Sequence, residues 1–222
     1  MVEVVTPRLE IRGLGKAFGG TLALSGVDLA IGPGEVHALL GENGAGKSTL
    51  TKIVSGVLRA DAGTLALDGQ PFSPRSPAEA RRAGVAIVHQ EPAVCPHLSV
   101  AENVMLGREP ARFGWVDRPR LRDEARRAIE WVAPEFSPDA AMSERGRAGV
   151  QLVTLARALA HANCRLLILD EPTSSLAAPE VERLFAVVRR LAESGVAVLY
   201  ISHFLEEVLR IADRYSVLRD GR

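Results

Sequence analysis

Apolar positions along this 222-residue chain follow two different periods. Short apolar runs bounded by glycine, proline or Asp-Gly turns are typical of strands. They predict strands at residues 8–12, 22–31, 35–40, 64–67, 85–88, 165–169, 196–201 and 215–218. Helical spacing predicts helices at 77–83, 179–194 and 205–212, and a further helix that begins near Gly46. Strands that alternate with helices in this way indicate an α/β fold with a parallel sheet.

The pattern changes between residues 92 and 162. Residues 98–106, 118–132 and 148–162 have helical spacing, and no strand pattern falls among them. We therefore expect a helical insertion at about 92–162 in an α/β core formed by about 1–91 and 163–222. The final Asp220-Gly221-Arg222 follows a strand, and Asp-Gly there is a strong hairpin signal. No returning strand follows, so we expect a fragment of a longer polypeptide; the alternative is a natural C-terminus at a turn.

Composition narrows the class of protein. Apolar residues make up 47%, an ordinary fraction for a globular core. Lys+Arg and Asp+Glu both number 27, so the zero net charge argues against a nucleic-acid binder that works by bulk charge. No apolar run approaches the roughly 18 residues that span a bilayer, and the N-terminus lacks a signal-peptide layout. Cys95 and Cys164 have no metal-ligand spacing and are expected to be reduced thiols in the cytoplasm.

One segment carries the clearest chemistry. Residues Gly41, Glu42, Asn43, Gly44, Ala45, Gly46, Lys47, Ser48 and Thr49 fit the phosphate-binding loop pattern G-x-x-x-x-G-K-[ST]. A predicted strand precedes the loop and a predicted helix follows it, which is the context that this motif needs. Its backbone N–H groups and the helix N-terminus favour a polyphosphate. The Lys47 amine can reach the β- and γ-phosphates, and the Ser48 hydroxyl can ligate Mg²⁺.

The ends of three later strands supply candidate catalytic residues. Asp170 is placed to hold Mg²⁺ through water, and Glu171 to polarise a water for attack on the γ-phosphate. His203 follows another apolar strand, where it can contact the γ-phosphate and orient that water. The Gln90 amide can ligate Mg²⁺ or the attacking water. Taken alone, each of these residues is more often an ordinary polar strand end, and the preceding phosphate loop favours function.

These motifs resemble a known family. Four segments occur in the order used by ATP-binding cassette (ABC) ATPases: Gly41–Thr49, Val88–Glu91, Leu166–Leu176 and Tyr200–Val208. The chain looks most similar to the first cassette of two-cassette ATPases that power bacterial uptake of simple sugars such as ribose, galactose or xylose. GEVHALLGENGAGKSTL, VAIVHQE, LSVAENVMLGREP and ISHFLEEVLRIADRYSVLRDGR carry this similarity.

The resemblance implies a P-loop NTPase fold with a RecA-like core, an antiparallel β subdomain and a helical subdomain. It implies binding of ATP and Mg²⁺, and ATP hydrolysis that drives a membrane permease. Phe18 stands where the family places an aromatic ring against adenine; its alternative role is a core phenylalanine. The implied partners are the permease's transmembrane subunits, a second cassette downstream and, indirectly, a periplasmic or lipoprotein solute-binding protein, without nucleic acid. The implied location is cytoplasmic, peripheral on the inner face of the membrane.

One departure from the family pattern leaves alternatives open. The family's LSGGQ-like signature falls on Arg145-Gly146-Arg147-Ala148-Gly149, where the serine is replaced by glycine and two arginines are added. The chain is therefore expected to bind ATP in its own site and to complete a partner's site poorly. The leading interpretation is an importer ATPase. The alternatives are an ATP-binding, catalytically weak regulatory half, and a soluble ABC ATPase acting on ribosomes or DNA, which would need basic or coiled-coil insertions that the sequence lacks.

Overall fold

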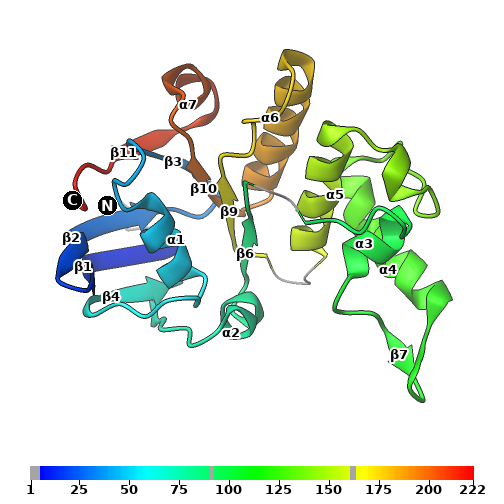
Figure 1. The fold of residues 1–222 in the computed structure, drawn as a ribbon, viewed down its shortest axis with the longest axis horizontal. Coiled ribbons are helices and arrows are strands. Elements are labelled where there is room, and N and C mark those ends of the chain that lie inside the picture. Colours follow the sequence, from blue (N-terminus) through cyan, green and yellow to red (C-terminus); the bar gives the residue numbers. More distant parts are fainter. Residues whose placement is uncertain (1–5, 91–92, 161–163) are drawn as a thin grey trace, which may run out of the picture. The chain divides into compact units, whose positions relative to one another are not determined.

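The computed structural model describes residues 6–90, 93–160 and 164–222 (Figure 1). The helices are α1 (Lys47–Val54), α2 (Pro77–Arg82), α3 (Val100–Met105), α4 (Arg118–Val132), α5 (Arg147–Leu159), α6 (Ala178–Glu193) and α7 (Leu205–Ile211), with a 3₁₀ turn η1 (Met142–Glu144). The strands are β1 (Leu9–Phe18), β2 (Thr21–Ile31), β3 (Val36–Leu40), β4 (Ala62–Leu67), β5 (Gln70–Pro71), β6 (Val85–Val88), β7 (Ala111–Arg112), β8 (Trp115–Val116), β9 (Leu166–Asp170), β10 (Ala197–Ile201) and β11 (Arg214–Val217).

The chain divides into two compact units. The first comprises Met1–Ile87, Cys164–Glu171 and Val188–Arg222, and the second comprises Val88–Asn163 and Pro172–Val187. An antiparallel sheet in the order β2-β1-β4-β5 belongs to the first unit. A second, five-stranded sheet has the order β11-β3-β10-β9-β6, and its strands β11, β3, β10 and β9 pair in parallel. The predicted α/β class with a parallel sheet is confirmed.

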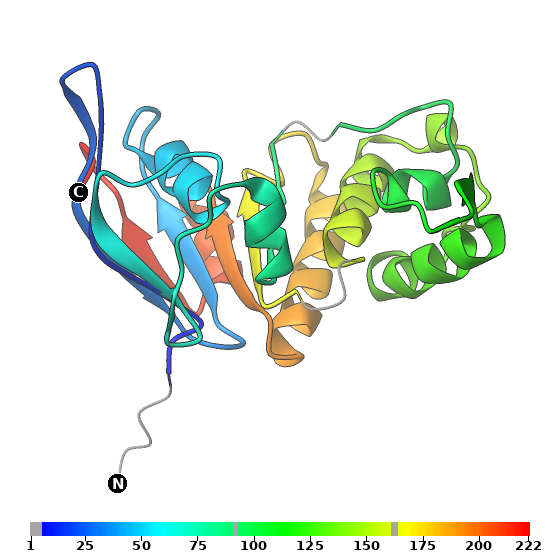
Figure 2. The same ribbon diagram turned by 90° about the horizontal axis from the view of Figure 1, so that it is seen from below.

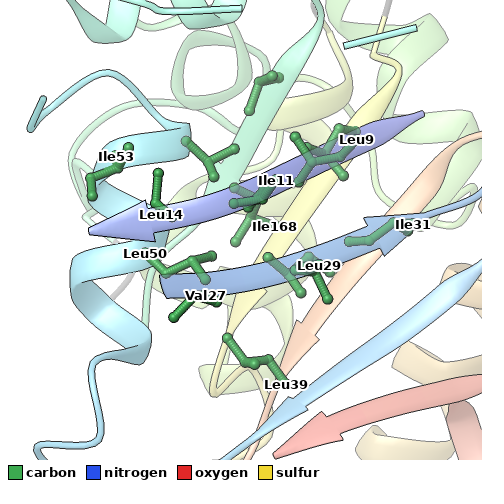
Figure 3. Packing of buried hydrophobic residues seen from close by; sticks show 14 of the residues in the cluster. Leu9, Ile11, Leu14, Val27, Leu29, Ile31, Leu39, Leu50, Ile53 and Ile168 are labelled. Carbon is green, nitrogen blue, oxygen red and sulfur yellow. The ribbon is translucent and has the colours of Figure 1, made fainter. Parts of the chain in front are cut away.

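The core of the first unit lies between these sheets and α1. Figure 3 shows Leu9, Ile11 and Leu14 of β1 directed toward the side chains of α1 and of the parallel sheet. Leu50 of α1 and Ile168 of β9 are fully buried in this cluster. Helix α1 buries one face there because its apolar residues recur at helical spacing. This packing fixes the helix that follows the phosphate loop.

The second unit contains the predicted helical stretch. Helices α3, α4 and α5 contact one another and lie together in both Figure 1 and Figure 2. Helix α4 has the predicted bounds, while the last two residues of the predicted helix 148–162 lie outside the described residues. The expectation that this stretch lacks strands is wrong, because β7 and β8 form a short hairpin. Two-residue strands are too short to show a period in the sequence.

Three parallel strands, β3, β9 and β10, end side by side at one edge of the sheet. Ile201 of β10 pairs with Leu39 of β3 on one side and with Asp170 of β9 on the other. The residues that follow these three strands therefore emerge side by side. In open α/β sheets, ligands bind at the carboxyl ends of the strands.

Candidate ATP-binding site

The phosphate loop connects β3 to α1, as the sequence predicted. Gly46 caps α1 with φ 108° and ψ −3°, a conformation that favours glycine. A Cβ atom at Gly46 would lie 2.6 Å from the Ala23 carbonyl oxygen, so the close approach of β2 also requires glycine. No side chain caps α1. Its first N–H groups are therefore available to an anion.

Lys47 is buried and lies against its own loop. Its amine donates hydrogen bonds to the carbonyl oxygens of Gly41, at 2.6 Å, and Glu42, at 3.1 Å. Ser48, the next residue, is exposed in the first turn of α1. The lysine is thus held at the loop by two neutral acceptors. A phosphate oxygen, which is charged, would be a stronger acceptor for the same ammonium group.

A turn near the end of β11 forms a backbone hydrogen bond to the phosphate loop. The N–H of Gly221 donates to the Ala45 carbonyl at 3.1 Å, and the Gly221 carbonyl accepts from the N–H of Ser25 at 2.7 Å. Arg219 and Arg222 exchange two backbone hydrogen bonds across Asp220-Gly221, so the predicted tight hairpin turn is confirmed. No local sequence pattern indicates that this turn contacts the phosphate loop.

The carboxylates at the end of β9 lie beside the end of β10. Glu171 has φ 47°, and its N–H donates to the Ile201 carbonyl at 3.0 Å. Its carboxylate oxygen lies 3.2 Å from Nδ1 of His203. Asp170, the preceding residue, is half-buried in β9. The structure therefore joins two sequence-predicted residues, Glu171 and His203, in one polar pair.

Phe18 lies at the end of β1, in the same unit as the phosphate loop. The residue is 47% exposed, which rules out the alternative of a core phenylalanine. The Lys16 amine lies 5.6 Å from the ring centroid and forms an ion pair with Asp61 at 2.7 Å. Hydrogen bonds from Lys16 and from the N–H of Ala17 lower the pKa of the Asp61 carboxyl. The exposed ring is thus accessible to a planar ligand.

Comparison with known proteins identifies the family. The family model described as "ABC transporter" matches residues 24–174, which include the phosphate loop and the Asp170–Glu171 pair. The chain belongs to the ABC transporter family. Solved ATP-binding cassettes of an ABC transporter, one in an ADP conformation and one nucleotide-free, match 97% of this chain at 27% identity, with TM-scores of 0.86 and 0.87; the match covers 88% of each.

Curated relatives share more sequence with this ABC cassette. A ribose import ATP-binding protein of Rubrobacter xylanophilus is 52% identical over 97% of the chain. Proteins of the same description from Chromobacterium violaceum and Escherichia coli O157:H7 are 50% and 46% identical over 96% and 98% of it. In each case the match covers 43% of the relative. The chain thus spans less than half the length of these relatives.

Gln90 belongs to the second unit. It is exposed and follows the end of β6 by two residues. The pair Glu171–His203 and Lys47 belong to the first unit. Glu91, which the resemblance also quoted, lies outside the described residues.

The degenerate signature lies at the start of α5. Gly146 is the N-cap residue, and no side chain caps the helix. The guanidinium of Arg145 lies 5.1 Å from the ring centroid of Phe136, whereas Arg147 is exposed at the first helical position. Arg145 is thus packed against an aromatic ring within its own unit, and the first turn of α5 has no hydroxyl at the position of the family's serine.

Sequence reasoning missed a polar cluster between α3 and α5. Asn103 is fully buried; its Oδ1 accepts from the Cys95 N–H at 2.8 Å, and its Nδ2 donates to the Cys95 carbonyl at 2.9 Å. Arg157 donates from Nε to the Asn103 carbonyl and from a terminal nitrogen to the Ala93 carbonyl, both at 2.7 Å. Desolvation by burial lowers the pKa of Arg157. A lone asparagine on the apolar face of a helix was the available signal.

Two kinds of feature are absent from the part of the chain that the structure describes. Among residues 6–90, 93–160 and 164–222, no group of three or more His, Cys, Asp or Glu side chains is arranged to hold a metal ion. None of the helices in these ranges is both long and apolar enough to cross a membrane.

Proposed function

We propose that the chain is the ATP-binding and ATP-hydrolysing cassette of an ABC importer for a simple sugar. The observation that carries the proposal is the Glu171–His203 pair beside the phosphate loop, at the adjoining ends of β9, β10 and β3. Such an arrangement suits phosphoryl transfer to water, because positioning and electrostatic stabilisation supply most of that catalysis. The names of the ribose import relatives support the substrate class.

Each residue has a role that follows from its position. The N–H groups of Gly44–Ser48 and the start of α1 would bind the β- and γ-phosphates, and the Lys47 amine would exchange the carbonyls of Gly41 and Glu42 for phosphate oxygens. Glu171 would take a proton from the attacking water. His203, held 3.2 Å from Glu171, would keep that carboxylate directed at the water and contact the γ-phosphate. Phe18 would stack on adenine.

The chemistry of the donors also fits Mg²⁺. This ion prefers oxygen ligands in octahedral geometry and retains several waters. The exposed Ser48 hydroxyl and the half-buried Asp170 carboxylate supply oxygen donors, and the Gln90 amide is a further donor. When bound, the ion would neutralise charge on the β- and γ-phosphates. We propose Ser48, Asp170 and Gln90 as the residues that hold it.

The partners follow from the family and from the length of the relatives. Because the chain spans 43% of the ribose import proteins, we propose that a second cassette completes the ATPase. The assembly would bind the transmembrane subunits of a permease at the cytoplasmic face of the membrane, and act indirectly with a solute-binding protein. We propose the helical insertion, residues 92–162, as the subdomain that moves between states.

The first turn of α5 supports a second candidate function. Its N-cap is Gly146 without a side-chain cap, and Arg145 packs on Phe136. A cassette with this segment would complete its partner's site poorly and would act as an ATP-binding, weakly hydrolysing regulatory half. Single-turnover hydrolysis by the full-length protein, compared with the same protein carrying a disabled second cassette, separates the two functions.

Two substitutions test the main proposal. Lys47→Ala should weaken binding of Mg-ATP measured by calorimetry, and equal affinity in both proteins would reject the phosphate site. Glu171→Gln should retain ATP and lower turnover about 10²-fold or more in the full-length protein with its permease, as expected for loss of a general base. Unchanged turnover would reject the role of Glu171.

A further inference from the structure

The segment that carries His203 is tied to the start of α7 by one carboxylate. Oε2 of Glu207 accepts a hydrogen bond from the hydroxyl of Tyr200 at 2.9 Å and another from the hydroxyl of Ser202 at 3.1 Å. Tyr200 and Ser202 are both buried, and they flank the last residue of β10. Glu207 therefore joins the end of the strand to the first turn of the next helix.

A third hydrogen bond extends this connection across His203. The hydroxyl oxygen of Ser202 accepts from the N–H of Phe204 at 3.0 Å while its hydrogen is donated to Glu207. The backbone on both sides of His203 is thus bonded through one serine side chain. Hydroxyl-to-carboxylate bonds are charge-assisted and stronger than neutral ones. His203 itself stays exposed, 3.2 Å from Glu171.

The start of helix α7 is a favourable position for the Glu207 carboxylate. Phe204 is the N-cap residue and offers no side-chain cap. A carboxylate in the first turn interacts favourably with the helix dipole. The neighbouring Glu206 is also in the first turn but is exposed, so the dipole alone does not distinguish the two residues. The hydrogen bonds from the buried hydroxyls of Tyr200 and Ser202 distinguish Glu207 from Glu206.

We infer that Glu207 is a positioning residue for ATP hydrolysis: it holds the backbone on either side of His203 so that the imidazole stays in contact with Glu171. This inference rests on the proposed function, in which His203 and Glu171 act on the γ-phosphate and the attacking water. Displacement of catalytic groups by about 1 Å can cost about 10²-fold in rate. Release of the segment should therefore lower turnover while the phosphate loop still binds ATP.

A double-mutant cycle in the full-length protein with its permease tests this role. Glu207→Ala should lower kcat about tenfold, with the KM for ATP changed less than about twofold. On a His203→Ala background the same substitution should change kcat less than about twofold, because the group that it positions is gone. Glu206→Ala is the matched control and should retain wild-type kcat. Glu207→Gln keeps an acceptor oxygen and should restore part of the lost kcat.

The outcomes separate this inference from the proposed function. Equal fold-losses for Glu207→Ala on the two backgrounds, or parallel changes in KM, would show a general structural role and overturn the inference alone. Wild-type turnover in His203→Ala would overturn both the role of His203 and the inference. If Glu207→Ala does not fold, Ser202→Ala is the second variant, because it removes the hydrogen bonds of the Ser202 hydroxyl to Glu207 and to the Phe204 N–H. It should lower kcat about threefold to fivefold, again only when His203 is present. An unchanged kcat in folded Ser202→Ala would refute the link.

Discussion

The buried amide of Asn103 allows a sharp test of how the segment around Cys95 is held. Its side chain forms three short hydrogen bonds: one from the Cys95 N–H at 2.8 Å, one to the Cys95 carbonyl at 2.9 Å, and one to the Ser99 carbonyl at 3.0 Å. Asn103→Leu preserves most of the side-chain volume and removes all three. The segment around Cys95 then loses its attachment to α3.

The expected cost can be worked from these contacts. A net contribution of about 1 kcal/mol for each hydrogen bond gives about 3 kcal/mol, since the partners at Cys95 are left without the amide. For a chain of this size, 1 kcal/mol lowers the unfolding midpoint by about 2–4 °C, so we expect a fall of about 6–12 °C. The apolar leucine avoids the additional cavity term that alanine would introduce.

Two measurements check the prediction. Thermal unfolding followed by circular dichroism gives the loss of stability. Thiol labelling at pH 8 reports on the segment itself, because burial raises the pKa of the Cys164 thiol to about 12 and leaves it almost wholly protonated. Cys95 is half-buried and should label faster in Asn103→Leu than in the wild type. Glu130→Leu, which introduces the same side chain at an exposed position of α4, is the control and should change neither measurement.

An unfolding midpoint within about 2 °C of the wild type would contradict this prediction. A loss of stability with Cys95 labelled at the wild-type rate would also contradict it, because the amide would then stabilise α3 without holding the segment around Cys95. Labelling in a Cys95→Ser protein measures the remaining signal from Cys164.

Substitutions at Phe18, Cys164 and Leu98 test other parts of the chain. Phe18→Ala should weaken ATP binding about tenfold, whereas Phe18→Tyr should stay within about threefold, because base stacking on an aromatic ring contributes roughly 1–3 kcal/mol; equal affinities by calorimetry would exclude stacking. Burial raises the pKa of the Cys164 thiol from 9.0 to about 12. The stability that depends on keeping this thiol neutral is therefore complete below pH 9.0 and is lost as pH rises from 9.0 to about 12, by about 1.4 kcal/mol per pH unit. Between pH 9 and about 11 the wild-type unfolding midpoint should therefore fall more steeply than that of Cys164→Ala, and parallel curves would contradict this. Leu98 lines a cavity of about 750 Å³ in the second unit. If the proposed permease docks at this surface, Leu98→Cys, in a background lacking Cys95 and Cys164, should crosslink to a cytoplasmic loop of that permease with a yield that changes with ATP. Absence of crosslinking in both states would place the docking surface elsewhere.

Elements with a continuous local pattern were predicted well from the sequence. Strand β2 and helix α4 lie within one residue of their expected bounds, because each buries one apolar face along most of its length: in β2 from Leu24 to Ile31, and in α4 from Leu121 to Val132. Strand β1 was expected to end at residue 12 but continues to Phe18. Register shifts between Ile11 and Ala17 interrupt its pairing with β2, and such irregularities break the period of two on which the prediction relied.

The sequence by itself determined the phosphate loop and the polar residues at the ends of β9 and β10. These motifs are local: a glycine-rich turn between a buried strand and a helix specifies its own backbone geometry. Only the tertiary structure decided which polar groups meet. The contact of Glu171 with His203, the attachment of Asn103 to Cys95 and the support of the phosphate loop by Gly221 depend on how separate elements pack. Hydrophobic periodicity specifies which face of an element is buried, but it carries no information about the partner that a buried polar atom finds there.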